Sequence, residues 1–83
     1  MFIAKIVIHS KSTVSDPEGL TVQNGLRQLG YASVTSVRSG KYFEIQVNET
    51  NLEIATEHVK IMCDKLLANP IIEDYEFDIE QIS

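Results

Sequence analysis

The stretch Leu66–Tyr75, LLANPIIEDY, decides the fold of the C-terminal half of this 83-residue chain. A proline lacks a backbone N–H and restricts the residue before it, so Asn69-Pro70 predicts that a helix ends here. Downstream, Tyr75 alternates with acidic neighbours in a pattern of period two, which is typical of a strand with one wet face. The stretch therefore predicts a helix, a break and a final strand.

The helix before this break is predicted from Thr50-Asn51-Leu52-Glu53, which matches a capping box. Its apolar residues recur at spacings of three and four, as expected for one buried helix face. They are Leu52, Ala55, Val59, Met62 and Leu66. The final strand places Tyr75, Phe77 and Ile79 on one face and Asp74, Glu76, Asp78 and Glu80 on the other.

The N-terminal half begins with alternating apolar residues from Phe2 to Ile8, which predict a strand with a buried side and a second face that is partly apolar. Asp16-Pro17 supplies an N-cap side chain and a proline at the first helical position, so a helix is predicted to about Leu29, with Gly30 as its stop. Gly25 inside that helix predicts a close backbone approach. The apolar stripe of the helix is Val22, Leu26 and Leu29.

Residues Ser33–Val47 are predicted to form a hairpin whose turn is Arg38-Ser39-Gly40-Lys41. The element order is then βαββαβ in a single domain, residues 1–83. Its simplest fold is α+β: a ferredoxin-like, four-stranded antiparallel sheet with both helices on one face. A core this small, without an internal disulfide, predicts association into oligomers.

Composition excludes several function classes. The formal net charge of −5 opposes nucleic-acid binding, which depends on lysine and arginine contacts to phosphates. No apolar run approaches the roughly 20 residues needed to span a bilayer, and the first residues lack a signal-peptide pattern. One cysteine, Cys63, fits a reducing cytoplasm.

Candidate chemistry is sparse. The loop at His9–Thr13 has no arginine or glycine-rich cradle for an acylphosphatase-like anion site, and an RNA-recognition surface would retain only Tyr42 beside acidic residues. Cys63 is expected to be a small buried hydrophobe, and His9 and His58 to be solvated. The acidic stripe of the last strand is expected to be solvated or to face a partner rather than to bind a cation. Whether Arg38 and Lys41 hold a phosphate, hold a partner carboxylate or are simply solvated stays open.

Four pieces of the sequence carry a family resemblance over nearly the whole chain. They are Asp16-Pro17-Glu18-Gly19, Leu29-Gly30-Tyr31, Val37–Ile45 (VRSGKYFEI) and Met62–Tyr75 (MCDKLLANPIIEDY). Together they resemble PurS, the small subunit of phosphoribosylformylglycinamidine synthase in purine biosynthesis. Two segments depart from the pattern: His9–Ser12 is more polar than expected, and Ser39 replaces a larger residue.

The resemblance implies a non-catalytic subunit of a ligase. The complex converts formylglycinamide ribonucleotide, glutamine and ATP to formylglycinamidine ribonucleotide, glutamate, ADP and phosphate. A synthetase subunit, PurL, uses ATP and magnesium, a glutaminase subunit, PurQ, releases ammonia, and PurS bridges the two and supports ammonia transfer.

This chain is accordingly expected to bind no cofactor or metal, to carry no catalytic residue and to form a homodimer or homotetramer in the cytoplasm. The candidate partner-interface residues are Asp16, Arg38, Gly40, Lys41, Tyr42, Asn69 and Asp74. An alternative from another class is a ligand-sensing regulatory domain of similar form, with Gly19, Gly25, Arg38 and Gly40 lining an effector site between subunits.

Overall fold

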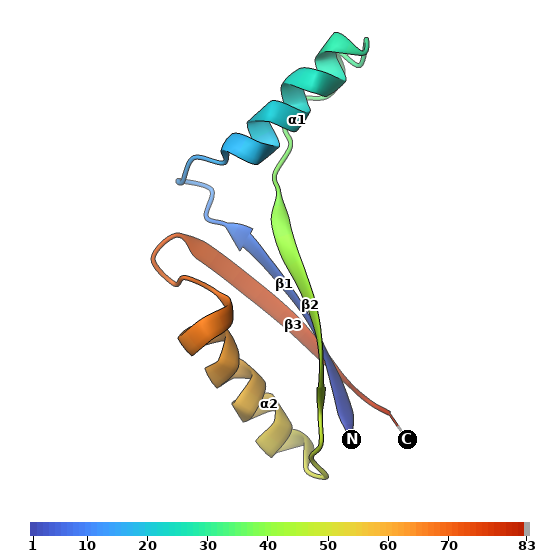
Figure 1. The fold of residues 1–83 in the computed structure, drawn as a ribbon, viewed down its shortest axis with the longest axis vertical. Helices are drawn as coiled ribbons and strands as arrows, with labels where there is room; N and C mark the ends of the chain where they lie inside the picture. The colour runs from blue at the N-terminus through green and yellow to red at the C-terminus, as the bar shows by residue number, and fades with distance from the viewer. Residues whose placement is uncertain (83) are drawn as a thin grey trace.

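The computed structural model describes residues 1–82, which form one three-stranded antiparallel sheet and two α-helices (Figure 1). The strand order is β2-β1-β3, so the N-terminal strand lies in the centre. In chain order the elements are β1 (Phe2–Ser10), α1 (Pro17–Gln28), β2 (Gly40–Val47), α2 (Leu52–Met62), the π-helical turn η1 (Cys63–Leu67) and β3 (Glu73–Gln81).

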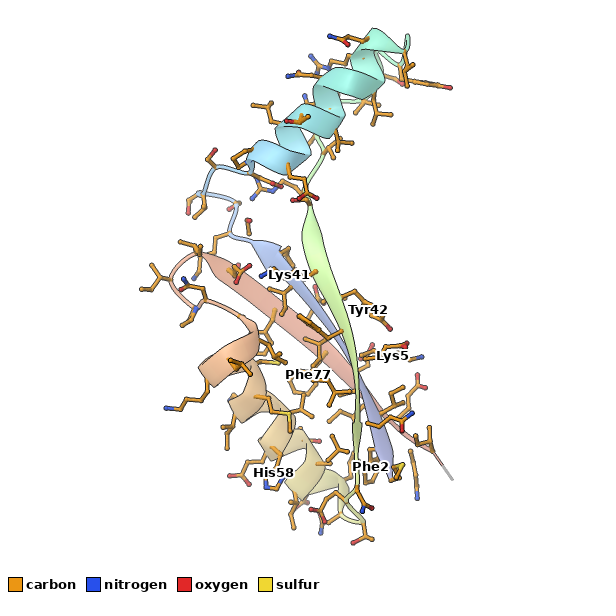
Figure 2. All side chains as sticks on the ribbon, viewed as in Figure 1. Phe2, Lys5, Lys41, Tyr42, His58 and Phe77 are labelled. Atoms are coloured by element: carbon orange, nitrogen blue, oxygen red, sulfur yellow. The ribbon has the colours of Figure 1, made fainter. Side chains whose placement is uncertain are left out.

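The core lies between the sheet and α2. Strand pairing aligns Ile6 with Phe43 of β2 and with Phe77 of β3, so these three side chains share the inner face that α2 covers. Figure 2 shows Phe2 and Phe77 on this face, with Tyr42 and Lys5 on the opposite, outer face. The buried cluster consists of Ala4, Ile6, Ile8, Val59, Cys63 and Ala68, with Phe2 also buried.

The predicted capping and stripe of the second helix need two corrections. Asn51, not Thr50, caps the helix: its side-chain oxygen accepts from the backbone N–H groups of Glu53 and Ile54 at 2.8 and 3.2 Å. Leu52 and Leu66 of the predicted stripe are 53% and 84% exposed. The buried residues are Ala55, Val59 and Cys63, which recur every four residues, so the face that packs on the sheet is rotated from the predicted stripe.

The four-stranded sheet was a wrong prediction, because residues 33–47 do not fold back as a hairpin. Only Gly40–Val47 is a strand, and Arg38–Lys41 is not a turn. The chain leaves α1, runs beside it through residues 31–39, and continues directly into β2 (Figure 1). A first hairpin strand beside β2 would require a reversal at Ser39-Gly40. Instead, Ser39 is hydrogen-bonded to Asp16, and Gly40 is paired with His9 of β1.

The prediction that both helices cover one face of the sheet is also wrong. Figure 1 shows α2 against the sheet and α1 extending beyond the sheet's end. The described chain measures 50 × 29 × 14 Å, with a radius of gyration of 16.4 Å. A compact domain of this length is expected to have a radius of about 12 Å. We call residues 17–39 the arm, and the sheet with α2 and η1 the body.

Glycines mark the limits of α1. Gly30 has φ of 102°, the left-handed geometry that commonly ends helices, as predicted. Gly25 has open space around it within the chain, so the close approach predicted for it is absent among residues 1–82. Gly19 has the close approach instead, since a Cβ there would lie 2.5 Å from the carbonyl oxygen of Val37.

Candidate partner-binding site

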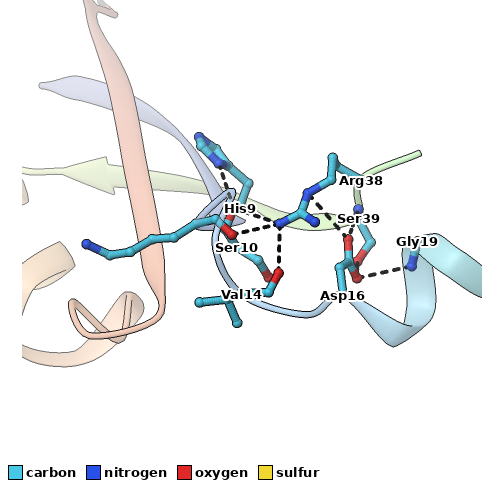
Figure 3. A network of polar contacts seen from close by, with 8 residues as sticks. His9, Ser10, Val14, Asp16, Gly19, Arg38 and Ser39 are labelled. Atoms are coloured by element: carbon cyan, nitrogen blue, oxygen red, sulfur yellow. Dashed lines mark hydrogen bonds and ion pairs between the residues drawn. The ribbon is translucent and has the colours of Figure 1, made fainter. Parts of the chain in front are cut away.

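Asp16 is the central residue of the junction between arm and body. Its side chain is only 6% exposed and caps α1 by accepting from the backbone N–H of Gly19 at 3.0 Å. The same carboxylate accepts from the backbone N–H and the hydroxyl of Ser39, each at 2.7 Å. One residue therefore fixes the start of α1 to the start of β2 (Figure 3).

Arg38 completes this junction from the other side. Its guanidinium donates to the backbone carbonyls of Lys11 at 2.9 Å and Ser10 at 3.2 Å, and lies 3.4 Å from that of Val14. Its Nε also lies 4.0 Å from the Asp16 carboxylate. Arg38 was predicted to present its charge to a partner. In the structure its guanidinium binds carbonyls of the loop between β1 and α1, and 40% of the side chain is still exposed.

The junction lowers the pKa of Asp16 to about 2. The hydrogen bond from the Ser39 backbone is the main cause, followed by those from the Gly19 backbone and the Ser39 hydroxyl, and Arg38 adds a smaller electrostatic contribution. The carboxylate is therefore ionised throughout the physiological range. An ionised cap is also favoured by the positive end of the α1 dipole.

Gly40 and Lys41 lie beside the junction, at the rim of a hollow of about 380 Å³ between α1 and the end of the sheet. Gly40 is required there, since a Cβ would lie 2.5 Å from the Ile8 carbonyl oxygen of the paired strand. The Lys41 ammonium lies 3.9 Å from Glu73 and keeps 60% of its side chain exposed. Carboxylates of Asp16, Glu18 and Glu73 also line the hollow, so its charge does not favour a phosphate.

Tyr42 and Asp74 lie on the outer face, which nothing covers within residues 1–82. Tyr42 is 55% exposed and donates a hydrogen bond to Glu44 at 3.0 Å. The acidic stripe of β3 is partly paired inside the chain: Lys11 with Asp74, His9 with Glu76 and Lys5 with Glu80, at 3.6, 3.9 and 3.5 Å. Separate pairs of this kind along one strand face are what we expect of a face that is solvated or faces a partner.

Asn69 shapes the break before β3. Its carbonyl accepts from the N–H of Glu73 at 2.7 Å and of Ile72 at 3.1 Å, and its side chain accepts from the N–H of Ile71. The Glu73 carboxylate accepts in return from the Asn69 N–H at 2.8 Å. The residue therefore has a local structural function, and a contact with a partner stays a prediction.

Cys63 and the histidines take the positions expected for them. Cys63 is fully buried against Ile8 and Val59 in the core cluster, and burial raises the pKa of its thiol, so it behaves as a small apolar residue. His58 lies on the exposed side of α2. His9 is half-exposed, with its ring near Glu76.

Two junction residues were not singled out from the sequence for this function. Ser39 was predicted to belong to a hairpin turn and noted as a departure from the family pattern, and Gly19 was placed in a family motif and in the effector site of the alternative. The available signal was Asp16 itself, since an N-cap carboxylate has a second oxygen free to bind a distant segment. Which segment it binds depends on a contact 23 residues away in the chain.

The family model described as PurS, phosphoribosylformylglycinamidine (FGAM) synthase, matches residues 3–81. This chain belongs to the PurS family. It is 39% identical to the PurS subunit of Bacillus subtilis over 99% of its own length and 96% of the relative's. It is 43% identical to that of Methanocaldococcus jannaschii over 99% of both chains. The family resemblance found in the sequence is thus confirmed.

Solved structures share the fold at the level of the whole chain. The M. jannaschii PurS structure has a TM-score of 0.88 at 43% identity and covers all of both chains. A chain from the structure of PurLQS from Thermotoga maritima has a TM-score of 0.85 at 33% identity, covering 96% of this chain and 99% of that one. The chain is therefore a PurS subunit of FGAM synthase, in purine biosynthesis.

Among residues 1–82, no helix has the length and apolarity to cross a membrane.

Proposed function

We propose that this chain is the non-catalytic assembly subunit of its FGAM synthase, bridging a PurL-type synthetase and a PurQ-type glutaminase and supporting ammonia transfer between them. The observation that carries the proposal is the full-length match to a chain of the T. maritima PurLQS structure. The proposal includes a cytoplasmic location and a homodimer or homotetramer. It assigns ATP and magnesium to the synthetase and no cofactor to this chain.

The arrangement of polar residues supports an assembly function. Asp16, Arg38 and Ser39 bind one another and the backbone, so they are used in holding the arm. Lys41 and Tyr42 remain more than half exposed at the start of β2, next to this rigid junction. A charge and an aromatic ring on a fixed strand are suited to contacting a partner. The alternative, a ligand-sensing regulatory domain, receives no support from the comparisons.

The experiment is reconstitution with the PurL and PurQ proteins of the same source. Without this chain, glutamine-dependent FGAM synthesis should fall by at least tenfold, while synthesis from added ammonium, which needs no transfer between subunits, should fall much less. Equal glutamine-dependent rates with and without the chain would contradict the bridging function.

Variants then test the exposed pair. Lys41→Ala with Tyr42→Ala should raise the concentration of this chain that gives half-maximal glutamine-dependent synthesis. Lys60→Ala, which removes an exposed lysine from α2, is the matched control and should not. Arg38 is unsuitable for this test, because its removal would also release the loop that it holds. An unchanged half-maximal concentration for the double variant would exclude this surface as a contact with the synthetase or glutaminase.

A further inference from the structure

The outer face of the sheet carries more negative than positive charge. Cross-strand pairing places Glu44 of β2 and Asp78 of β3 directly opposite Lys5 of β1. Lys5 makes its ion pair with Glu80, at 3.5 Å, and neither Glu44 nor Asp78 has a cation within ion-pair distance among residues 1–82. The carboxylates of this face belong to Glu44, Asp74, Glu76, Asp78 and Glu80, and the lysines beside them are Lys5 and Lys11. Five carboxylates against two lysines leave an excess of three negative charges.

Val7 and Tyr42 form an apolar centre within this acidic face. They are directly opposite each other in the pairing of β1 with β2, and their exposed fractions are 42% and 55%. Helix α2 covers the inner face of the sheet, and Figure 2 shows Tyr42 and Lys5 on the side away from it. An apolar centre with a polar rim is the usual anatomy of a protein–protein interface.

A hollow beside Val7 adds shape to this surface. It has a volume of about 110 Å³ and is lined by Lys5, Val7 and residues 76–78. A water molecule occupies roughly 30 Å³ in the liquid, so the hollow has room for the end of one long side chain. Its lining combines the apolar side chain of Val7 with the carboxylates of Glu76 and Asp78.

We propose that the outer face is the docking surface for the synthetase subunit and that it recognises a basic, arginine-bearing surface there. An arginine of the synthetase enters the hollow, with its stem over Val7 and its guanidinium between the carboxylates of Glu76 and Asp78. The inference rests on the bridging function proposed above and assigns the surface and the charge of one of the two contacts that bridging requires.

The free carboxylates decide that the docked surface is basic. Covering Glu44 and Asp78 with an apolar surface would remove two charges from water without a counter-charge, which is costly. Arginine fits the hollow better than lysine, because its planar guanidinium can bind two carboxylates at once and its stem packs on apolar side chains. The Glu76 carboxylate is 79% exposed and lies 3.9 Å from the His9 ring, so it remains accessible to such a contact.

Charge also separates the synthetase from the other two occupants. A second copy on this face would place one acidic surface against another, and such like-charge contacts are unfavourable. The synthetase makes phosphoribosylformylglycinamidine, whose phosphate is anionic, so basic surface is expected on it. The substrate of the glutaminase, glutamine, has no net charge.

Binding of the full chain to the purified synthetase tests the charge. Glu44→Gln with Asp78→Asn should raise the dissociation constant at least roughly tenfold, the loss expected when charge-assisted contacts become neutral. The variant should also show a weaker dependence of the constant on salt, because fewer charges are then paired across the interface. Glu53→Gln with Glu57→Gln is the matched control: it removes the same charge from exposed positions on α2 and should not change the constant.

Val7→Lys tests the hollow. The new ammonium can reach the carboxylates of Glu76 and Asp78 and would take the place of the partner's arginine, so the dissociation constant should again rise at least roughly tenfold. Leu66→Lys adds the same charge at an exposed apolar position outside this face and should not change the constant. Both positions are exposed, so circular dichroism should show both variants folded.

Three results would overturn the proposal. They are synthetase binding that does not weaken with salt, unchanged binding by the Glu44→Gln, Asp78→Asn and Val7→Lys variants, and a loss of glutaminase binding or of self-association in place of synthetase binding. Each leaves the bridging function standing, because that function is measured by glutamine-dependent synthesis with the chain present or absent. Equal synthesis in those two conditions would contradict bridging whatever the variants bind.

Discussion

The body and the arm of this molecule are stabilised by different forces. In the body, β1 is paired on both sides and α2 covers its inner face, so Ala4, Ile6, Ile8 and Val59 are fully buried. In the arm, α1 buries only Gly19, and a polar junction holds it in place. Apolar burial therefore supports the body, and directional hydrogen bonds orient the arm. Substitutions in the two regions should differ in size and in what they disturb.

The largest effect is expected in the body. Ile6→Ala removes three carbons from a fully buried side chain and should cost about 2–5 kcal/mol of unfolding free energy, a large share of what a small domain has. Urea denaturation followed by circular dichroism measures it. Leu66→Ala, at an 84% exposed position, should change the free energy by less than about 0.5 kcal/mol. Similar losses for both would mean that the two side chains are not buried as described.

A glycine pair in α1 gives the next effect. Gly19→Ala would place a Cβ 2.5 Å from the Val37 carbonyl and 2.6 Å from an Asp16 oxygen, so the junction must shift at a cost of about 1–3 kcal/mol. Gly25→Ala meets no neighbouring segment among residues 1–82 and should stabilise α1 by about 0.5–1 kcal/mol. Exchange rates of α1 amides should rise in the first variant and fall in the second. The same sign for both would contradict the close contact at Gly19.

Acid should loosen the arm before the body. The folded pKa of Asp16, about 2, is below its ordinary value of 3.8, so ionisation stabilises the junction above about pH 4. That stabilisation is lost as the pH falls from about 4 toward 2. Exchange protection in α1, corrected for intrinsic rates, should decline over this range more than protection in β1, and Asp16→Asn should remove most of the difference. A parallel decline in both regions would show that the junction does not control the arm.

The smallest effect is expected at the edge of the body. Tyr75 donates its hydroxyl to Asp64 at 2.7 Å, and this bond is the main reason that the pKa of Tyr75 rises to about 12. Tyr75→Phe keeps the ring beside Phe77 and should cost about 0.5–1.5 kcal/mol. Stability measured from pH 8 to 12 should drop between about 10 and 12 in the parent, where the neutral hydroxyl is lost, and this drop should be smaller in the variant, in which the raised pKa values of Tyr42 and Cys63 still contribute.

Local sequence signals predicted the elements well and their arrangement less well. Asp16-Pro17 and Gly30 set the ends of α1 as predicted, and Asn69-Pro70 separates α2 from β3. The alternation in β1 identified the buried face correctly. The errors included Arg38–Lys41, where turn-forming residues serve a junction, and the stripe of α2, of which Leu52 and Leu66 are exposed. The cap of α2 and the placement of α1 on the sheet were also predicted wrongly.

The candidate site was predicted in part. Asp16, Arg38, Gly40 and Lys41 were chosen from separate motifs, and the structure brings them together around one end of the sheet. Asp16 and Arg38 are bound within the chain, and their contacts with partners stay predictions. Tyr42 and Asp74 lie near the same end, since Tyr42 follows Lys41 and Asp74 pairs with His9 across from Gly40. Asn69 binds Glu73, which lines the same hollow, and the contacts of these three residues with partners also stay predictions.

By itself, the sequence determined the family, the ends of α1, the break before β3 and the buried face of the central strand, because these depend on residues near one another in the chain. Only the tertiary structure decided that residues 33–39 continue β2 instead of pairing with it, and that α1 extends away from the sheet. Both results depend on Asp16 binding Ser39 and Arg38 binding the loop after β1, across 23 to 28 residues. A hairpin turn and a junction can use the same polar and glycine residues, and long-range hydrogen bonds decide between them.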